Sequence, residues 1–245
     1  MLSVQEQKIV LFLISQLKPE QKEFDYQTFD IIDFCEMCGI DHRSGKHYAA
    51  LKSAIKSLSD RSMWVIGEGE KGKKETLMRW LLKAEIEAGS GKIGVMIDPD
   101  MKPFLLELRE RYTQFDLIYT LGMKSKYSVR LYEILKSYEK LNEPVYFTLE
   151  RFKEAMGTEY DRWADVKRRI VEPALKEINL LSDLSVIYST GKKGKSIVSI
   201  TFLLRVKQGF DEQTETMRAI YQTLERKPAI EPIPGQIMLD GSVVE

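Results

Sequence analysis

The sequence is poor in cysteine and histidine, with two of each among 245 residues. Two cysteines cannot build the disulfide framework of a small secreted domain. The two histidines do not form a His-x-His pair, so a nuclease that holds its metal with paired histidines would lack its ligands. We therefore expect no metal, no cofactor and no catalytic residue in this protein.

Long apolar stretches are also missing. The longest run, residues 9–14, is far shorter than the ~20 residues of a membrane-spanning helix. The N-terminal sequence Met-Leu-Ser-Val-Gln-Glu lacks the basic start of a signal peptide. Apolar residues make up 43% and charged residues 30%, a balance typical of folded globular proteins rather than disordered ones. We expect a cytoplasmic protein of one or two domains that does not associate with membranes.

The formal net charge is zero, which excludes a binder held to nucleic acid by bulk charge. The charge is nevertheless uneven along the chain. Residues 162–207 hold ten basic and four acidic residues, whereas residues 208–245 hold three basic and seven acidic residues. This pattern predicts a basic module followed by an acidic tail, although a basic stretch can also be an ordinary solvated face.

Helix and strand signals form two successive sets along the chain. In the first set, Ser3 and Glu6 form a capping box ahead of an apolar helical face, and a second helix begins at Thr28 or Asp30. The further elements expected there are helices over 44–58 and 99–109 and strands over 63–66, 76–86 and 92–97. The second set comprises helices from about 125 to 138, 148 to 157 and 162 to 181, and strands over 145–147, 184–189 and 197–206.

The two sets match one another. Residues 34–39 and 152–157 both read Phe-x-Glu-x-x-Gly, and the next helix of each set ends in Leu-Ser-Asp, followed by a β-hairpin. The repeated order of helix, short strand, helix, helix and hairpin is typical of the winged helix-turn-helix. We predict an α+β protein with two tandem winged-helix domains and hairpin wings. Two packing units without nucleic acid remain the alternative.

The expected boundaries follow from these elements. They are an N-terminal domain for DNA binding and dimerisation over 1–110, a linker over 111–123, a C-terminal DNA-binding domain over 124–207 and a mobile acidic tail over 208–245 that contains one weak helix.

Three motifs resemble known functional sites, but each differs from the consensus of that site. Residues 67–74 nearly spell a P-loop, but Lys74 stands where Ser or Thr must hold Mg²⁺, and a strand follows instead of a helix. Residues 89–94 match Gly-x-Gly-x-x-Gly but join two expected strands, which indicates a hairpin turn. Cys35 and Cys38 precede His42 and His47 too closely for a zinc finger, so we expect the cysteines to be core residues.

The helix expected over 162–181 carries a polar face suited to DNA. Arginine reads guanine edges through two hydrogen bonds, and asparagine can read adenine. The candidate DNA contacts on this helix are Lys167, Arg168, Arg169, Lys176 and Asn179. Pro173 should kink the helix because it removes a backbone hydrogen bond. In the hairpin turn expected over 191–195, the side chains of Lys192, Lys193 and Lys195 are placed for phosphates, with a merely solvated hairpin as the alternative.

Several segments together resemble the replication initiator (Rep) proteins of iteron-controlled plasmids. They are residues 2–9 (Leu-Ser-Val-Gln-Glu-Gln-Lys-Ile), 125–135 (Ser-Lys-Tyr-Ser-Val-Arg-Leu-Tyr-Glu-Ile-Leu), 171–179 (Val-Glu-Pro-Ala-Leu-Lys-Glu-Ile-Asn), 183–186, 192–195 and 200–202. The similarity spans about residues 2 to 207. The chain departs from many members in beginning almost inside its first helix, where they carry an additional N-terminal segment.

The resemblance implies a tandem winged-helix protein that binds direct repeats at a plasmid origin and has no catalytic activity. It implies monomers that initiate replication, homodimers that repress the protein's own promoter, and recruitment of the host initiator and the replicative helicase. The remaining candidate DNA contacts are Lys124, Ser125, Lys126 and Arg130 in the second domain, and Arg43, Lys46, Lys52 and Lys56 in the first.

For the dimer, we expect an apolar strand edge in the first domain, formed by residues 76–86 and 92–97. Met78, Trp80 and Leu82 alternate along the first of these strands. The alternative is that these side chains only pack on their own domain.

Two other functions stay open. One is a winged-helix transcription regulator without a role in replication, which repeated sites beside the gene would distinguish. The other is a nicking or joining nuclease; the scarcity of histidine argues against it, and the eleven tyrosines leave a tyrosine nucleophile open.

Overall fold

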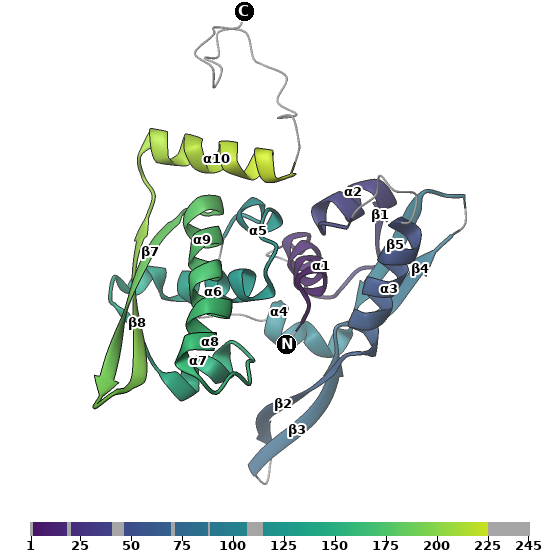
Figure 1. Cartoon of the computed structure of the whole chain (residues 1–245). Coiled ribbons are helices and arrows are strands. Elements are labelled where there is room, and N and C mark those ends of the chain that lie inside the picture. The colour runs from purple at the N-terminus through teal and green to yellow at the C-terminus, as the bar shows by residue number, and fades with distance from the viewer. Residues whose placement is uncertain are drawn as a thin grey trace, which may run out of the picture. The chain divides into compact units, whose positions relative to one another are not determined.

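A computed structural model of the protein describes residues 2–18, 21–40, 47–69, 72–87, 89–106 and 115–224. The chain divides into two units, Met1–Leu117 and Ile118–Glu245 (Figure 1). The boundary lies inside the linker expected over 111–123, because the short helix α5 (Ile118–Leu121) belongs to the second unit.

The first unit begins with α1 (Val4–Ser15), and the expected capping box is present. The Glu6 backbone N–H donates to the Ser3 hydroxyl, and the Ser3 N–H donates to the Glu6 carboxylate at 2.6 Å. The following elements are β1 (Gln27–Asp30), α2 (Ile31–Met37), α3 (His47–Asp60), β2 (Ser62–Gly69), β3 (Gly72–Arg79), β4 (Leu81–Ile86), β5 (Lys92–Ile97), the 3₁₀ turn η1 (Pro99–Met101) and α4 (Lys102–Leu105).

The second unit has the same order with one hairpin fewer. After α5 come α6 (Lys126–Tyr138), the 3₁₀ turn η2 (Glu139–Leu141), β6 (Val145–Thr148), α7 (Leu149–Ala155), α8 (Trp163–Val166), a π-helical turn (Lys167–Val171), α9 (Glu172–Leu181), β7 (Leu184–Lys193), β8 (Ser196–Val206) and α10 (Phe210–Leu224). Ser125 and Thr148 cap α6 and α7 by accepting hydrogen bonds from backbone N–H groups of the first turn, as their side-chain chemistry predicts.

The duplicated motif has the same structure in both units. Phe34 and Phe152 are buried in their respective cores, and the helices that carry them both end at a glycine with positive φ, 66° at Gly39 and 55° at Gly157. Glycine is suited to this left-handed position because it has no Cβ. The short strands also pair equivalently, since β1 joins β5 and β6 joins β8. The predicted tandem architecture is therefore present in the backbone.

The first unit contains one hairpin more than the second. Its three-stranded sheet has the order β1-β5-β4, which corresponds to β6-β8-β7. Strands β2 and β3, which follow α3 and precede β4 in the sequence, form a separate two-stranded hairpin that projects away from this sheet (Figure 1). The single strand expected over 76–86 is therefore wrong: it is two strands, interrupted at Trp80. The carbonyl of Trp80 accepts a hydrogen bond from the Asp98 N–H at 3.1 Å, which joins the interruption to the end of β5.

The apolar edge expected from Met78, Trp80 and Leu82 is only partly exposed. Met78 is buried, Trp80 packs against the core of its own unit, and Leu82 alone is exposed. The change of strand at Trp80 explains this result, because the alternation does not continue on one face. The exposed apolar side chains of the extra hairpin are instead Trp64, Ile66 and Leu77.

The tail expected to be mobile from residue 208 begins with an ordered helix. Helix α10 packs on α9 and α5 and buries Thr216 and Ile220. Its apolar residues recur at helical spacing, so the helix gains stability by packing rather than by propensity alone.

Among the helices of the described ranges, none is long and apolar enough to cross a membrane.

Candidate nucleic-acid interface

The helix expected over 162–181 is continuous but changes its winding. Arg162 precedes α8, the π turn follows at Lys167, and α9 continues from Glu172 to Leu181. The Glu172 N–H donates to the carbonyl of Lys167, five residues earlier. Pro173 has no N–H, so it cannot donate the helical hydrogen bond to the Arg169 carbonyl. The π turn lies directly before Pro173. A π turn thus stands at the place where the sequence predicts a kink.

Three consecutive basic side chains lie on the exposed side of this π turn. Arg168 Nη2 is 3.1 Å and Arg169 Nε is 3.7 Å from the same oxygen of Asp165, and Lys167 Nζ is 3.4 Å from Glu172. The Arg169 guanidinium also lies 5.3 Å from the centre of the Tyr160 ring. Exposed ion pairs of this kind contribute about 0–1 kcal/mol. The charges are therefore oriented but remain available to a phosphate or base edge.

The candidate residues further along α9 divide into two kinds. Lys176 is exposed, as expected for a contact residue. Asn179 is not suited to read a base, because its amide nitrogen donates to the carbonyl of Val186 at 2.9 Å and its amide oxygen accepts from the Val186 N–H at 2.6 Å. These bonds tie α9 to the edge of β7, so we assign Asn179 a structural role instead of adenine recognition.

The three wing lysines are exposed at the end of the β7–β8 hairpin. The turn is tighter than the sequence indicates: Lys192 and Lys193 lie within β7, and only Gly194 and Lys195 separate the strands. Gly191 precedes a register shift, and a Cβ there would lie 2.3 Å from the Ser199 hydroxyl oxygen. A side chain at this position would therefore require the Ser199 hydroxyl to rotate away.

The candidate residues at the start of α6 are mostly engaged in local structure. The backbone N–H groups of Lys124 and Ser125 donate to the Glu177 carboxylate of α9 at 3.2 Å, and the Ser125 hydroxyl caps the helix. Arg130 Nε donates to the Ala155 carbonyl at 3.2 Å. The Lys126 ammonium lies 5.0 Å from the centre of the Tyr127 ring. Among these four candidates, the lysine side chains are the best placed to meet a phosphate.

In the first unit, Lys52 and Lys56 are both exposed on α3, four residues apart on one side of the helix. Lys56 Nζ is 2.5 Å from the Asp60 carboxylate. The other two candidates, Arg43 and Lys46, lie outside the described residues.

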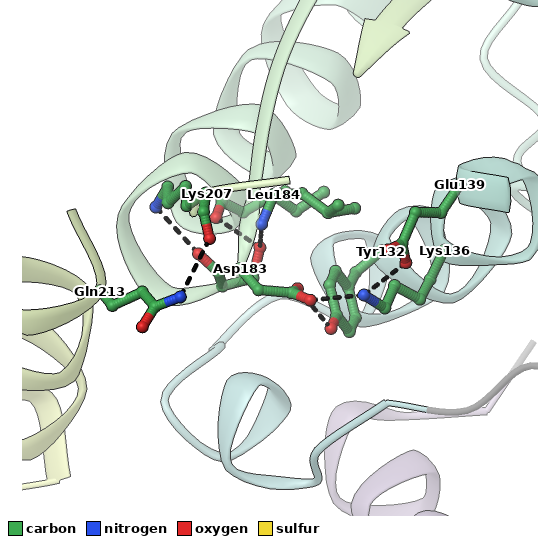
Figure 2. A network of polar contacts seen from close by, with 9 residues as sticks. Tyr132, Lys136, Glu139, Asp183, Leu184, Lys207 and Gln213 are labelled. Atoms are coloured by element: carbon green, nitrogen blue, oxygen red, sulfur yellow. Dashed lines mark hydrogen bonds and ion pairs between the residues drawn. The ribbon is translucent and has the colours of Figure 1, made fainter. Parts of the chain in front are cut away.

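The carboxyl end of α9 is held by a polar network that sequence reasoning missed (Figure 2). The Asp183 carboxylate accepts hydrogen bonds from the Tyr132 hydroxyl at 2.9 Å and from the Lys136 ammonium of α6. Lys136 is also 2.5 Å from the Glu139 carboxylate. Beside them, the ammonium of Lys207, just after β8, donates to the carbonyls at the end of α9. The repeated Leu-Ser-Asp motif marks this turn in the sequence. No sequence pattern near Lys207 indicates that its ammonium bonds there.

The cysteine pair, the P-loop-like stretch and the Gly-x-Gly-x-x-Gly stretch are structural elements of the first unit. Cys35 and Cys38 are buried, and burial raises the pKa of the Cys35 thiol to about 11 and raises the pKa of Cys38 further. The P-loop-like stretch spans the β2–β3 hairpin, and Gly89–Gly94 leads from β4 into β5. Within the described ranges, no group of three His, Cys, Asp or Glu side chains could hold a metal ion.

Comparison with known proteins identifies the two halves. Residues 1–136 match the family described as "Initiator Replication protein, WH1", and residues 148–204 match "Initiator Rep protein, WH2". The chain belongs to the plasmid replication initiator family. The predicted family and the predicted pair of winged-helix domains are thereby confirmed. Neither family description names an enzymatic activity.

Two relatives of the replication initiator illustrate how far the likeness extends. A "Replication initiation protein" of Escherichia coli is 21% identical over 225 residues, covering 87% of this chain and 68% of the relative. A crystal structure of the WH1 domain of a replication protein isolated from a multiple sclerosis patient is 20% identical. It covers 42% of this chain and 78% of the domain, with a TM-score of 0.34.

Proposed function

We propose that this replication initiator binds direct repeats, the iterons, at a plasmid origin and promotes opening of the DNA there. The observation that carries the proposal is the exposed basic face of the second winged-helix unit. In winged-helix domains the third helix enters the major groove and the hairpin lies along phosphates. The α8–α9 segment and the β7–β8 hairpin are the corresponding elements of this chain.

In this proposal the basic residues have distinct roles. Arg168 and Arg169 contact base edges or phosphates at the start of the recognition helix, because arginine can bind a guanine through two hydrogen bonds. The three hairpin lysines contact phosphates, since a lysine ammonium is a point charge without a preferred plane. Further phosphate contacts come from Lys124, Lys126, Lys167 and Lys176, and in the first unit from Lys52 and Lys56.

The proposal also includes a monomer–dimer equilibrium. Monomers bind the iterons, and a homodimer represses the initiator's own promoter, where an inverted repeat would fit a two-fold dimer. The extra hairpin of the first unit is the best candidate surface: Trp64 lies directly opposite Leu77, and their exposed fractions are 65% and 49%. Ile66, two residues along β2, shares that face and is equally exposed.

The host initiator and the replicative helicase complete the proposed set of partners. The initiator itself would act by binding in the cytoplasm, without a membrane, a cofactor or a catalytic step.

A footprint of the protein on DNA flanking its gene tests the function. We expect several protected direct repeats, and their deletion should abolish replication of the plasmid. Protection of a single operator whose deletion changes only transcription would favour a regulator. In a parallel reaction, supercoiled origin plasmid is incubated with the protein and Mg²⁺ or Mn²⁺. Relaxed circles there would revive the nuclease hypothesis.

A further inference from the structure

The Lys207 side chain occupies a buried position between the carboxyl end of α9 and helix α10. Its ammonium donates hydrogen bonds to the Asn179 carbonyl at 2.6 Å, the Ser182 carbonyl at 2.8 Å and the Thr216 hydroxyl at 3.0 Å. The first two acceptors lie at the carboxyl end of α9, and the third lies in α10. All three protons of the ammonium are thus used, and the residue is 9% exposed.

The acceptors explain why a charge is tolerated at this position. The last carbonyls of a helix have no intrahelical partner and carry partial negative charge, which favours a cation. Burial lowers the pKa of Lys207, and the nearby carboxylates of Glu212 and Asp183 oppose that effect. Removing the ammonium would leave two α9 carbonyls without their donor, which is costly inside a protein.

Besides its apolar packing through Ile220, helix α10 is joined to the rest of the unit by polar contacts around this lysine. The Gln213 side chain donates to the Lys207 carbonyl at 3.3 Å, as Figure 2 shows, and Arg205 binds Glu212 through two hydrogen bonds of 2.9 and 2.7 Å. Lys207 is the residue that bonds to α10 and to the end of α9 with the same group. The position of α10 is thereby coupled to that of the recognition helix.

The coupling matters because the basic residues stand at the opposite end of that helix. A helix of ten residues is about 15 Å long, so a tilt of about 10° at one end moves the other by roughly 2–3 Å. A displacement of this size exceeds the range over which a hydrogen bond to a base edge persists.

We propose that Lys207 is a positioning residue for DNA binding: it ties the carboxyl end of α9 to α10 and so holds the recognition helix where its arginines meet the DNA. This inference rests on the proposed function. It makes α10 part of the DNA-binding apparatus.

The test uses the full chain with two substitutions. Lys207→Met keeps most of the apolar stem and removes all three donors, whereas Thr216→Val removes only the acceptor on α10. Val145→Ala, which creates a cavity at a buried position of β6, is the control for general loss of stability in the same unit. For each protein we would measure affinity for an iteron duplex and for a scrambled duplex, and amide hydrogen exchange along α9.

Lys207→Met should lose about tenfold or more in iteron affinity with less than about twofold change on scrambled DNA, and Thr216→Val should change in the same direction by less. Amides at the end of α9 should exchange faster in both variants. Val145→Ala should not lower the ratio of specific to non-specific binding. A folded Lys207→Met protein with parental iteron affinity and parental exchange overturns the proposal. If Lys207→Met does not fold, parental behaviour of Thr216→Val overturns it instead. A parent that binds both duplexes equally refutes the proposed function, whereas the exchange data still decide whether Lys207 holds α9.

Discussion

The side-chain amide of Asn179 pairs with the backbone of Val186 in the way a neighbouring strand would. The amide donates to the Val186 carbonyl and accepts from its N–H, at 2.9 and 2.6 Å. These bonds satisfy one residue at the outer edge of β7 and fasten the recognition helix to the wing. An exposed strand edge is otherwise open to unwanted pairing.

Replacing Asn179 with alanine should therefore destabilise the protein. We expect the free energy of unfolding to fall by about 1–3 kcal/mol, because a backbone donor and acceptor lose their partner. Chemical denaturation measures the change, and Lys176→Ala, on the exposed face of the same helix, serves as the control. Unchanged stability combined with a selective loss of specific DNA binding would mean that Asn179 reads a base after all.

Arg168 and Arg169 should be needed for sequence recognition. Alanine at a base-reading arginine is expected to cost about 1–3 kcal/mol of binding free energy on the specific site and to relax specificity. Binding titrations with specific and scrambled duplexes measure this, with Lys140→Ala, an exposed lysine in η2, as the matched control. If both arginine variants bind the specific site like the parent, the recognition helix is wrongly assigned.

The wing lysines should contribute without regard to sequence, because phosphate contacts position a protein but do not read bases. Alanine at Lys192, Lys193 and Lys195 together should weaken specific and non-specific binding almost equally. The salt dependence of the logarithm of the affinity should become shallower by up to about 0.9 for each phosphate that the variant no longer neutralises. A salt titration on both DNAs, beside the Arg168→Ala protein, makes the comparison. An unchanged slope would leave this turn as an ordinary solvated hairpin.

Dimerisation should depend on the exposed face of the β2–β3 hairpin. The double variant Trp64→Ser and Leu77→Ser removes apolar surface from opposite positions of that hairpin without touching the core. We expect it to remain monomeric at concentrations where the parent dimerises, as measured by sizing across a wide concentration range. Ile187→Ser, which changes an equally exposed apolar residue in the second unit, should leave the equilibrium unaltered. A parent that stays monomeric at every concentration without DNA would end the dimer proposal.

The Glu6 carboxylate should make the first unit sensitive to acid. Burial raises its pKa, but hydrogen bonds from Arg61, Ser57 and Ser3 outweigh burial and lower the pKa from 4.5 to about 2. The stabilisation is therefore fully present above about pH 4.5 and is lost as the pH falls towards 2. Glu6→Gln should cost about 2–3 kcal/mol at neutral pH and flatten the dependence of stability on pH in acid. Denaturation of both proteins between pH 3 and 7 measures this; parallel curves would contradict it.

Much of the fold could be predicted because its signals are local. Ser3 and Glu6 form the expected capping box, and the matching Phe-x-Glu-x-x-Gly segments end in equivalent glycine turns. The exposed basic face at Lys167–Arg169 was also visible, because helical spacing separates it from the buried stripe. The break at Trp80 was not predicted, since the residues on both sides of it have similar strand propensity.

The order of helices and strands and the basic helix and hairpin were predictable from the residues, because caps, periodicity and charge act between positions a few residues apart; the family followed from the resemblance of longer segments to replication initiators. The use of the polar groups was not predictable, because it depends on the assembled unit. The Asn179 amide bonds to Val186, the Glu177 carboxylate accepts from the start of α6, and the Lys207 ammonium bonds to α9, 28 residues earlier in the chain, and to α10. A buried polar group bonds to whatever partner packing brings to it, and that partner is set by the assembled unit rather than by its neighbours in sequence.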